Sequence, residues 1–223
     1  MNELIISGPS GAGKDTIIDM WIERNPRIKR VVTATTRAPR PNEVDGVHYH
    51  FYSHEEIQNR IDNDEFLEHM NVFGNIYGTP KSSVQSIVDN GDVAIIRIDV
   101  QGAIDVIPKL PNATTIFVLP PSLEELRRRL TERGTDSPEK IEERMDTAIA
   151  EIICSQLYDC QIVNDDRETA VQQLEDILSG QVYEDSDLAM KCMWMQHNER
   201  THEKIDQFLA LAAERGVGFE YPV

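Results

Sequence analysis

The chain has no long apolar run, although hydrophobic residues make up 40% of its 223 positions. No stretch approaches the roughly 20 apolar residues that a membrane-spanning helix requires. The first residues, Met1 to Ile6, lead straight into a glycine loop without a basic flank. We therefore expect neither a signal peptide nor a membrane anchor, and no membrane as a partner.

Cysteine is also scarce in this sequence. The three cysteines, Cys154, Cys160 and Cys192, are odd in number and lack the spacing of a metal-ligand set. We interpret them as reduced packing residues, which favours a cytoplasmic protein.

Positive charge is in short supply, because 22 Lys and Arg residues stand against 39 Asp and Glu residues and give a net charge of −17. Such an acidic surface repels the phosphate backbone, which argues against a polymeric nucleic acid as a partner. Arginine outnumbers lysine by 15 to 7. Because a guanidinium group can bind phosphate through two hydrogen bonds, we expect small phosphorylated ligands.

Short β-branched apolar runs recur along the chain and predict strands. They lie at Leu4–Ser7, Val31–Thr35, Val93–Ile98, Thr114–Leu119 and Cys160–Val163. Longer helical patterns separate most of these runs, and this alternation predicts an α/β fold in which helices cover a parallel sheet.

Three helical segments are clearest in the sequence. One follows the first strand and stops at Asn25, and the others run from about Leu123 to Thr131 and from about Pro138 to Ile153. The segment Val44–Thr79 is rich in His, Tyr, Phe and Gly and interrupts the alternation. We expect it to form an inserted subdomain of mixed structure.

A tail of 43 residues follows Gly180, and its pattern predicts two amphipathic helices that end at Gly216. One helix face carries Leu188, Cys192 and Met195, and the other carries Ile205, Phe208, Leu209 and Ala212. We expect these helices to pack on the main domain. Packing on a second copy is the alternative, so the oligomeric state stays open and the tail could mediate self-association.

A glycine-rich loop follows the first strand and opens a helix. Its residues are Gly8, Pro9, Ser10, Gly11, Ala12, Gly13 and Lys14. Backbone N–H groups and the helix N-terminus can surround the phosphates of a nucleotide here, and Lys14 can reach the outer phosphates. The loop predicts ATP binding but leaves the acceptor open, because ATPases, GTPases and kinases all use it.

The residue after the lysine departs from the usual loop. Serine or threonine normally places a hydroxyl on Mg²⁺, whereas this chain has Asp15, followed by Thr16. A carboxylate is also a ligand for Mg²⁺, so we expect Asp15 to bind the metal that accompanies ATP. Alternatively, Asp15 only caps the helix N-terminus.

A candidate site for a second phosphate follows, where Arg37 and Arg40 are held by prolines and followed by Tyr49. Three further motifs are Phe66-Leu67-Glu68, Gly74-Asn75-Ile76-Tyr77-Gly78-Thr79 and Ile98-Asp99-Val100-Gln101-Gly102-Ala103. In this order the motifs resemble guanylate kinases, P-loop nucleoside monophosphate kinases that phosphorylate GMP with ATP. The resemblance runs from Leu4 to about Leu178.

The resemblance implies a P-loop kinase core of three αβα layers around a parallel sheet. A GMP-binding insertion of mixed α/β structure would span about residues 33–80, and a small helical lid would span about 122–146. The whole domain would cover residues 1–180, and a helical extension would cover 181–223.

The resemblance also assigns the acceptor residues. Arg37, Arg40, Tyr49 and Tyr77 would hold the GMP phosphate, Glu43 and Asp99 would belong to the same GMP site, and Thr33 and Thr79 would address the carbonyl edge of guanine. Glu68 would accept hydrogen bonds from the ring N–H and the amino group, a pair of donors that adenine lacks. Alternatively, Glu68 is a surface acid and the two tyrosines are core residues.

On the donor side, the resemblance implies that Arg129, Arg133 and Arg144 close over the ATP phosphates. Arg127 and Arg128 fit solvated helix positions better. Asn164 would lie beside the adenine. Catalysis would then depend on Lys14, Arg37, Arg133 and Arg144.

Arg97 is a second departure from the family. Many members have Asp two residues before Asp99, where this chain has Arg97. We hypothesise that the acid near Mg²⁺ has been relocated to Asp15. Alternatively, the two changes are unrelated and Arg97 pairs with Asp99.

Three functions are compatible with these motifs. The first is in-line transfer from MgATP to GMP or dGMP. The second is a ribose 1,5-bisphosphate phosphokinase, because that related family carries a Gly-Lys-Asp loop, but Glu68, Tyr77 and Thr79 would be unnecessary for it. The third is a non-catalytic guanylate kinase-like domain that binds phosphorylated peptides, which the intact Lys14 disfavours.

Overall fold

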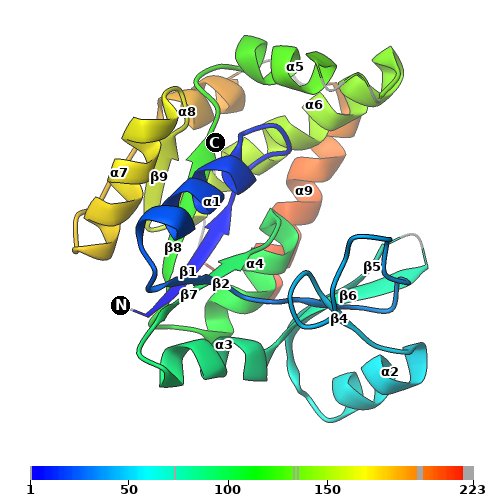
Figure 1. The fold of residues 1–223 in the computed structure, drawn as a ribbon. Coiled ribbons are helices and arrows are strands. Elements are labelled where there is room, and N and C mark those ends of the chain that lie inside the picture. Colours follow the sequence, from blue (N-terminus) through cyan, green and yellow to red (C-terminus); the bar gives the residue numbers. More distant parts are fainter. Residues whose placement is uncertain (1, 73, 133, 135, 195–197, 218–223) are drawn as a thin grey trace.

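A computed structural model describes residues 2–72, 74–132, 134, 136–194 and 198–217. Its main sheet has the strand order β2-β7-β1-β8-β9, and every neighbouring pair is parallel (Figure 1). The strands are β1 (Glu3–Ser7), β2 (Ile28–Arg30), β7 (Val93–Arg97), β8 (Thr114–Leu119) and β9 (Cys160–Val163). The predicted parallel sheet is confirmed.

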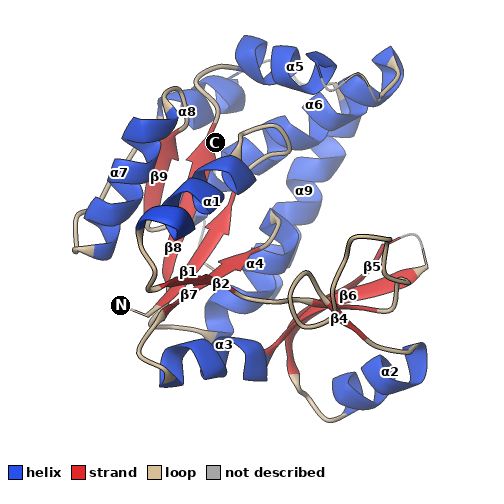
Figure 2. Ribbon diagram, in the orientation of Figure 1, coloured by secondary structure: helices blue, strands red, loops and turns tan. Residues whose placement is uncertain are grey.

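Both faces of this sheet are covered by helices, as Figure 2 shows. Leu4 and Ile6 point to the face packed by α1 (Lys14–Arg24) and α7 (Arg167–Leu178). Ile5 points to the opposite face. There it meets the core formed with α3 (Lys81–Asp89), α4 (Val100–Val106), α6 (Pro138–Ile153), α8 (Asp187–Trp194) and α9 (Glu199–Glu214). The three-layer αβα core is therefore confirmed.

A second sheet has the order β4-β3-β6-β5. Its strands are β3 (Ala34–Thr35), β4 (His50–Phe51), β5 (Phe66–Val72) and β6 (Asn75–Pro80). Helix α2 (His54–Asp62) begins at a capping box and places Ile57 on Ala34 and Phe66, which form a small separate core. This sheet and helix are the mixed subdomain expected from the sequence.

The single strand predicted over Val31–Thr35 is wrong. The chain pairs with β7 over β2 and through the N–H of Val31, then crosses to the second sheet and enters β3 at Ala34. Val31 is 5% exposed and donates its N–H to Ile95 O at 2.9 Å. The apolar run thus reflects burial at the junction of the two sheets as well as strand structure.

The segment expected as a lid comprises α5 (Leu123–Glu132) and the first part of α6, joined by an ion pair between Arg127 and Glu142. Two short 3-10 turns, Ile107–Lys109 and Cys154–Leu157, follow α4 and α6.

The tail helices α8 and α9 pack on the main domain, as expected. Cys192, Ile205 and Ala212 are buried in its core. Leu188, Phe208 and Leu209 are partly buried against the same core, and Met195 lies outside the described residues. All three cysteines are free and buried. Within the described ranges, no helix is both long enough and apolar enough to cross a membrane.

Candidate active site

The glycine loop lies between β1 and α1 and has the backbone that its sequence predicts. Gly8, Gly11 and Gly13 all have positive φ angles, which residues with a side chain rarely adopt. A Cβ atom on Gly8 would also collide with the backbone carbonyl of Val118. The loop therefore needs glycine both for its turn and for its close approach to β8.

Lys14 closes this loop. Its Nζ donates to Pro9 O at 3.0 Å and to Gly8 O. Burial lowers the pKa of the Lys14 ammonium group, while the facing Glu151 carboxylate opposes that shift. Lys14 is thus held in a position that faces the space enclosed by the loop.

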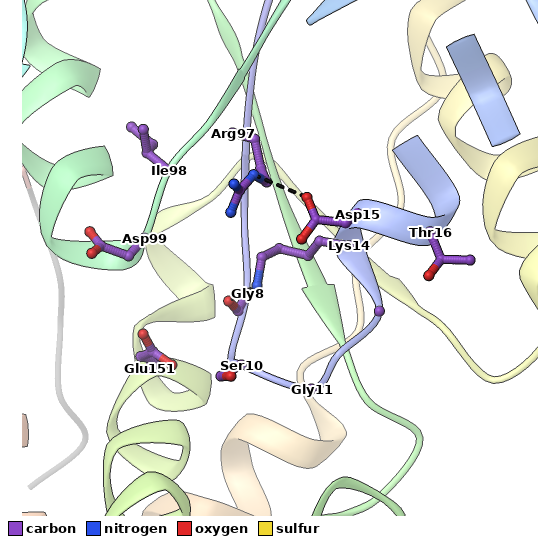
Figure 3. A pocket seen from close by; sticks show the side chains of 11 residues that line it. Gly8, Ser10, Gly11, Lys14, Asp15, Thr16, Arg97, Ile98, Asp99 and Glu151 are labelled. Carbon is purple, nitrogen blue, oxygen red and sulfur yellow. Dashed lines mark hydrogen bonds and ion pairs between the residues drawn. The ribbon is translucent and has the colours of Figure 1, made fainter. Parts of the chain in front are cut away.

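A cavity of about 280 Å³ opens beside Lys14 (Figure 3). It is lined by Gly8, Ser10, Gly11, Gly13, Lys14, Asp15, Thr16, Arg97, Ile98, Asp99 and Glu151. Most of the loop residues predicted for ATP therefore gather around one polar cavity. The end of β7 and the helix α6 supply its other walls.

Asp15 makes ion pairs with two arginines, one of which, Arg97, also lines this cavity. The Oδ1 atom of Asp15 lies 3.2 Å from Arg97 Nε, a contact that Figure 3 shows, and 3.5 Å from Arg30 Nη1. Helix α1 has Gly13 at its N-cap, and Asp15 lies in its first turn, where a carboxylate interacts favourably with the helix N-terminus, so the capping alternative for Asp15 stays a prediction beside metal binding. Arg97 pairs with Asp15, whereas Asp99 accepts from Gly102 N at 2.8 Å and caps α4.

Two of the predicted lid arginines reach the loop. Arg144 Nη1 donates to Ser10 Oγ at 3.2 Å, and Arg129 Nη1 donates to Ala12 O at 3.4 Å. Arg133 lies outside the described residues. Arg127 and Arg128 form exposed ion pairs with glutamates, as expected for solvated helix charges.

Asn164 follows β9, and its side chain contacts the backbone of the glycine loop. Asn164 is 3% exposed, and its Nδ2 donates to Ala12 O at 2.7 Å. Arg129 Nη2 donates to the Asn164 carbonyl at 3.1 Å. The amide N–H is therefore engaged with the loop backbone, and the expected position of Asn164 beside adenine stays a prediction.

The residues expected at the acceptor phosphate cluster around Arg37. Its Nη2 donates to Glu43 Oε1 at 2.8 Å, its Nε donates to Tyr77 OH at 3.2 Å, and its guanidinium carbon lies 5.5 Å from the Tyr49 ring centroid. Hydrogen bonds from the Arg37 side chain and the Arg40 backbone lower the pKa of Glu43 to about 2. These contacts show that Tyr49 and Tyr77 are not simply core aromatics.

Arg40 joins this cluster through its backbone, because its N–H donates to Glu43 Oε2 at 2.8 Å. Arg40 itself is exposed to solvent. Thr33 stands just before β3, where its carbonyl accepts from His50 N at 2.8 Å.

Glu68 and Thr79 face each other on β5 and β6. Thr79 Oγ1 donates to Glu68 Oε1 at 2.6 Å, and Glu68 is only 8% exposed, so the surface-acid alternative is wrong. Burial raises the pKa of Glu68, the Thr79 hydrogen bond opposes this, and the charge of Asp99 adds to it. Tyr77 lies two residues before Thr79 on the same face of β6.

Glu151 is the cavity residue that the sequence analysis missed. It lies on α6 seven residues after Arg144, a spacing that places both side chains on one helix face. Burial raises the pKa of its carboxyl group, and the charge of Lys14 opposes the shift. The helical spacing from Arg144 is the signal that could have identified it.

A family model, curated relatives and a solved structure were compared with this chain, and all three comparisons match guanylate kinases. The guanylate kinase family model matches residues 1–181. The chain is 49% identical over 175 residues to the guanylate kinase of Clostridium perfringens strain SM101, covering 78% of this chain and 81% of that protein. It is 44% identical over 176 residues to the guanylate kinase of Alkalilimnicola ehrlichii, covering 79% and 87%.

A solved structure is also similar. The crystal structure of guanylate kinase from Anaplasma phagocytophilum matches with a TM-score of 0.61 and 34% identity. This match covers 80% of this chain and 84% of that chain.

Proposed function

This chain belongs to the guanylate kinase family and transfers a phosphate from ATP to GMP, and we propose here which of its residues carry out each part of that reaction. The observation that carries the proposal is strand β6. It holds Thr79 against the buried Glu68 and, on the same face, Tyr77 against Arg37. A site for a purine base and a site for a phosphate thus lie along one strand.

The acceptor site binds GMP at both ends. Arg37, Arg40, Tyr49 and Tyr77 bind the phosphate, and Glu43 orients Arg37. Glu68 accepts from the ring N–H and the amino group of guanine, while Thr33 and Thr79 address its carbonyl edge. AMP would leave the buried Glu68 carboxylate without these donors, and that cost supports selection of guanine.

The donor site binds ATP around the glycine loop. Backbone N–H groups of the loop residues other than Pro9, from Gly8 to Thr16, surround the phosphates, and Lys14 moves from its carbonyl partners to the outer phosphates. Arg129, Arg133 and Arg144 stabilise the charge that develops during transfer. Support comes from Arg144, which already contacts Ser10 of the loop. We also assign Asn164 to the adenine side of this site.

Magnesium fits this cavity through Asp15. Both ion pairs that Asp15 makes within the described ranges use Oδ1, so Oδ2 remains for a ligand. The side chain is 59% exposed, which suits an ion that keeps several waters and takes only one or two carboxylates. When bound, Mg²⁺ neutralises charge on the phosphate oxygens. The residues of this chain supply the remaining positive charge.

We extend the proposal to the organisation of the chain. Residues 1–180 form the catalytic domain, with the GMP insertion at about 33–80 and the lid at about 122–146, and residues 181–223 form an extension. The free, buried cysteines suit a cytoplasmic protein. The net charge of −17 disfavours a nucleic acid polymer as a partner.

A coupled assay of ATP consumption tests the acceptor. GMP and dGMP should each support turnover in the presence of Mg²⁺, and AMP should support at least roughly 100-fold less. Turnover with ribose 1,5-bisphosphate in place of GMP would contradict the proposed site, and so would binding of GMP without any turnover.

A further inference from the structure

A buried carboxylate connects the lid helix to the tail. Asp146 lies on α6 two residues after Arg144, and its side chain is 8% exposed. Two residues correspond to about 200° around a helix, so Asp146 points away from the face that carries Arg144 and Glu151 to the phosphate cavity. Helix α6 therefore has one face on the phosphate loop and another on a different partner.

That partner is the start of α9. Asn198 Nδ2 and Thr201 Oγ1 donate to Asp146 Oδ1 at 2.6 and 3.1 Å, and Arg200 Nε lies 3.1 Å from Oδ2. Asn198 also caps α9 by accepting from Thr201 N at 2.9 Å. A buried carboxylate with several donors is costly to separate from them, so this contact fixes α6 and α9 relative to each other.

The other end of α9 reaches α4. Arg215 Nε lies 2.6 Å from Oδ1 of Asp105 on α4, and Asp99, the N-cap of α4, lines the cavity beside the glycine loop. Figure 1 shows α9 running beside α6 towards α4. Lys204, in the middle of α9, also contributes a charge that lowers the pKa of Glu151. The tail helix thus joins the two helices that bring acidic and basic groups to the cavity.

The match to the family model ends at residue 181, so the partners of Asp146 and Asp105 in these contacts come from residues beyond it. We propose that α9 is a working part of the donor-phosphate site, in which Asn198, Arg200 and Thr201 are positioning residues that hold Arg144 on the phosphate loop through Asp146. This inference rests on the proposed role of Arg144 at the ATP phosphates.

Releasing the contact should affect the two substrates differently. Arg144 lies next to Ser10, and a displacement of about 1 Å is enough to weaken such a contact strongly. The acceptor residues Glu68, Thr79 and Arg37 belong to the second sheet or its loops, away from Asp146. The KM for ATP should therefore rise while the KM for GMP stays unchanged.

Asp146→Asn in the full chain tests this. The substitution keeps the size of the side chain and removes its charge, and we expect the KM for ATP to rise at least about fivefold with the KM for GMP within twofold. The affinity for MgADP, measured by calorimetry, should fall in parallel. Asp206→Asn is the matched control, because it makes the same chemical change at an exposed position of α9 and should leave both constants unchanged.

Thr201→Val keeps the test valid if Asp146→Asn fails to fold. It removes one hydroxyl donor at nearly constant volume and should also raise the KM for ATP. Thr201→Ser keeps the hydroxyl and should therefore keep the KM for ATP of the parent. A purely structural role would lower the amount of active enzyme, and so the apparent kcat, while leaving both KM values alone. That result would overturn the proposal.

Arg144→Ala separates failure of this inference from failure of the assigned donor site. If it raises the KM for ATP while the tail variants do not, the tail has no positioning role. If Arg144→Ala leaves the KM for ATP unchanged, the assignment of Arg144 is wrong, and the inference that rests on it is overturned as well.

Discussion

Asp15 Oδ1 lies 3.2 Å from Arg97 Nε, so the two residues that depart from the family pattern are partners. Asp15 lies in the first turn of α1 and Arg97 ends β7, and both line the cavity beside the glycine loop. The contact agrees with the hypothesis that the two changes are connected.

Asp15→Asn should raise the Mg²⁺ concentration needed for half-maximal rate at least about tenfold, because it removes the charge of the proposed ligand. The rate is measured against free Mg²⁺ at saturating ATP and GMP. An unchanged Mg²⁺ dependence would show that Asp15 is only an ion-pair partner.

A double-mutant cycle tests the connection between positions 15 and 97. Asp15→Ser restores the usual loop but leaves Arg97 without its partner, so it should be impaired and partly rescued by Arg97→Asp. Kinetic constants of both single variants and the double variant give the coupling. Simple additivity would refute the hypothesis of a relocated charge.

Lys14→Ala should remove nearly all phosphate transfer and leave GMP binding largely intact, because Lys14 lies in the glycine loop, away from the second sheet. Turnover and GMP affinity are measured on the same preparation. A comparable loss of GMP affinity would mean that the donor and acceptor sites are misassigned.

Arg40→Ala should raise the KM for GMP by roughly 30-fold or more, as expected when a charge-assisted contact to phosphate is lost. Because Arg40 is exposed, the thermal stability of the variant should stay close to that of the parent. An unchanged KM for GMP would remove Arg40 from the acceptor site.

Glu68→Gln should have opposite effects on stability and binding. Burial raises the pKa of Glu68, so without ligand this group favours the folded state most at low pH and progressively less as pH rises past the usual glutamate range. The glutamine variant should therefore be more resistant to urea than the parent at neutral pH. It should bind GMP at least about tenfold more weakly, because one acceptor is replaced by a donor. Equal urea midpoints would contradict the first expectation.

The contribution of Glu43 to stability should change with pH in the opposite direction to that of Glu68. The pKa of Glu43 is lowered to about 2. Its contact with Arg37 therefore stabilises the fold fully above the usual glutamate pKa, and this stabilisation is lost as pH falls from there towards about 2. The difference in urea midpoint between the parent and Glu43→Gln should be largest near neutral pH and should shrink as the medium is acidified to about pH 3. A difference that does not change with pH would exclude this ion pair as its source.

The sequence predicted best those features that short contiguous motifs determine. The glycine loop requires particular residue types at fixed spacing, and Glu68 and Thr79 are recognisable from their neighbours. The prediction of one strand over Val31–Thr35 was wrong, because local hydrophobicity does not distinguish a buried crossing between two sheets from one continuous strand.

The contacts that the sequence could not predict are between single charged residues far apart in the chain. Glu151 and Asp146 look like ordinary acids of an amphipathic helix, and their importance depends on which helix face packs against the loop or against α9. The partner of Arg97 likewise depended on how α1 sits against the end of β7.

The alternation of β6 has a consequence for substrate length. Tyr77 and Thr79 are two residues apart on one face, which corresponds to roughly 7 Å along a strand. In the proposed acceptor site, this spacing along β6 separates the residue assigned to the phosphate from the residue assigned to the base, so we expect that a ligand must be long enough to contact both Tyr77 and Thr79. A shift of the β5–β6 pairing by one residue would turn both side chains to the opposite face at once. If the proposed site is correct, recognition of nucleotide size depends on the register of these two strands as well as on the chemistry of individual side chains.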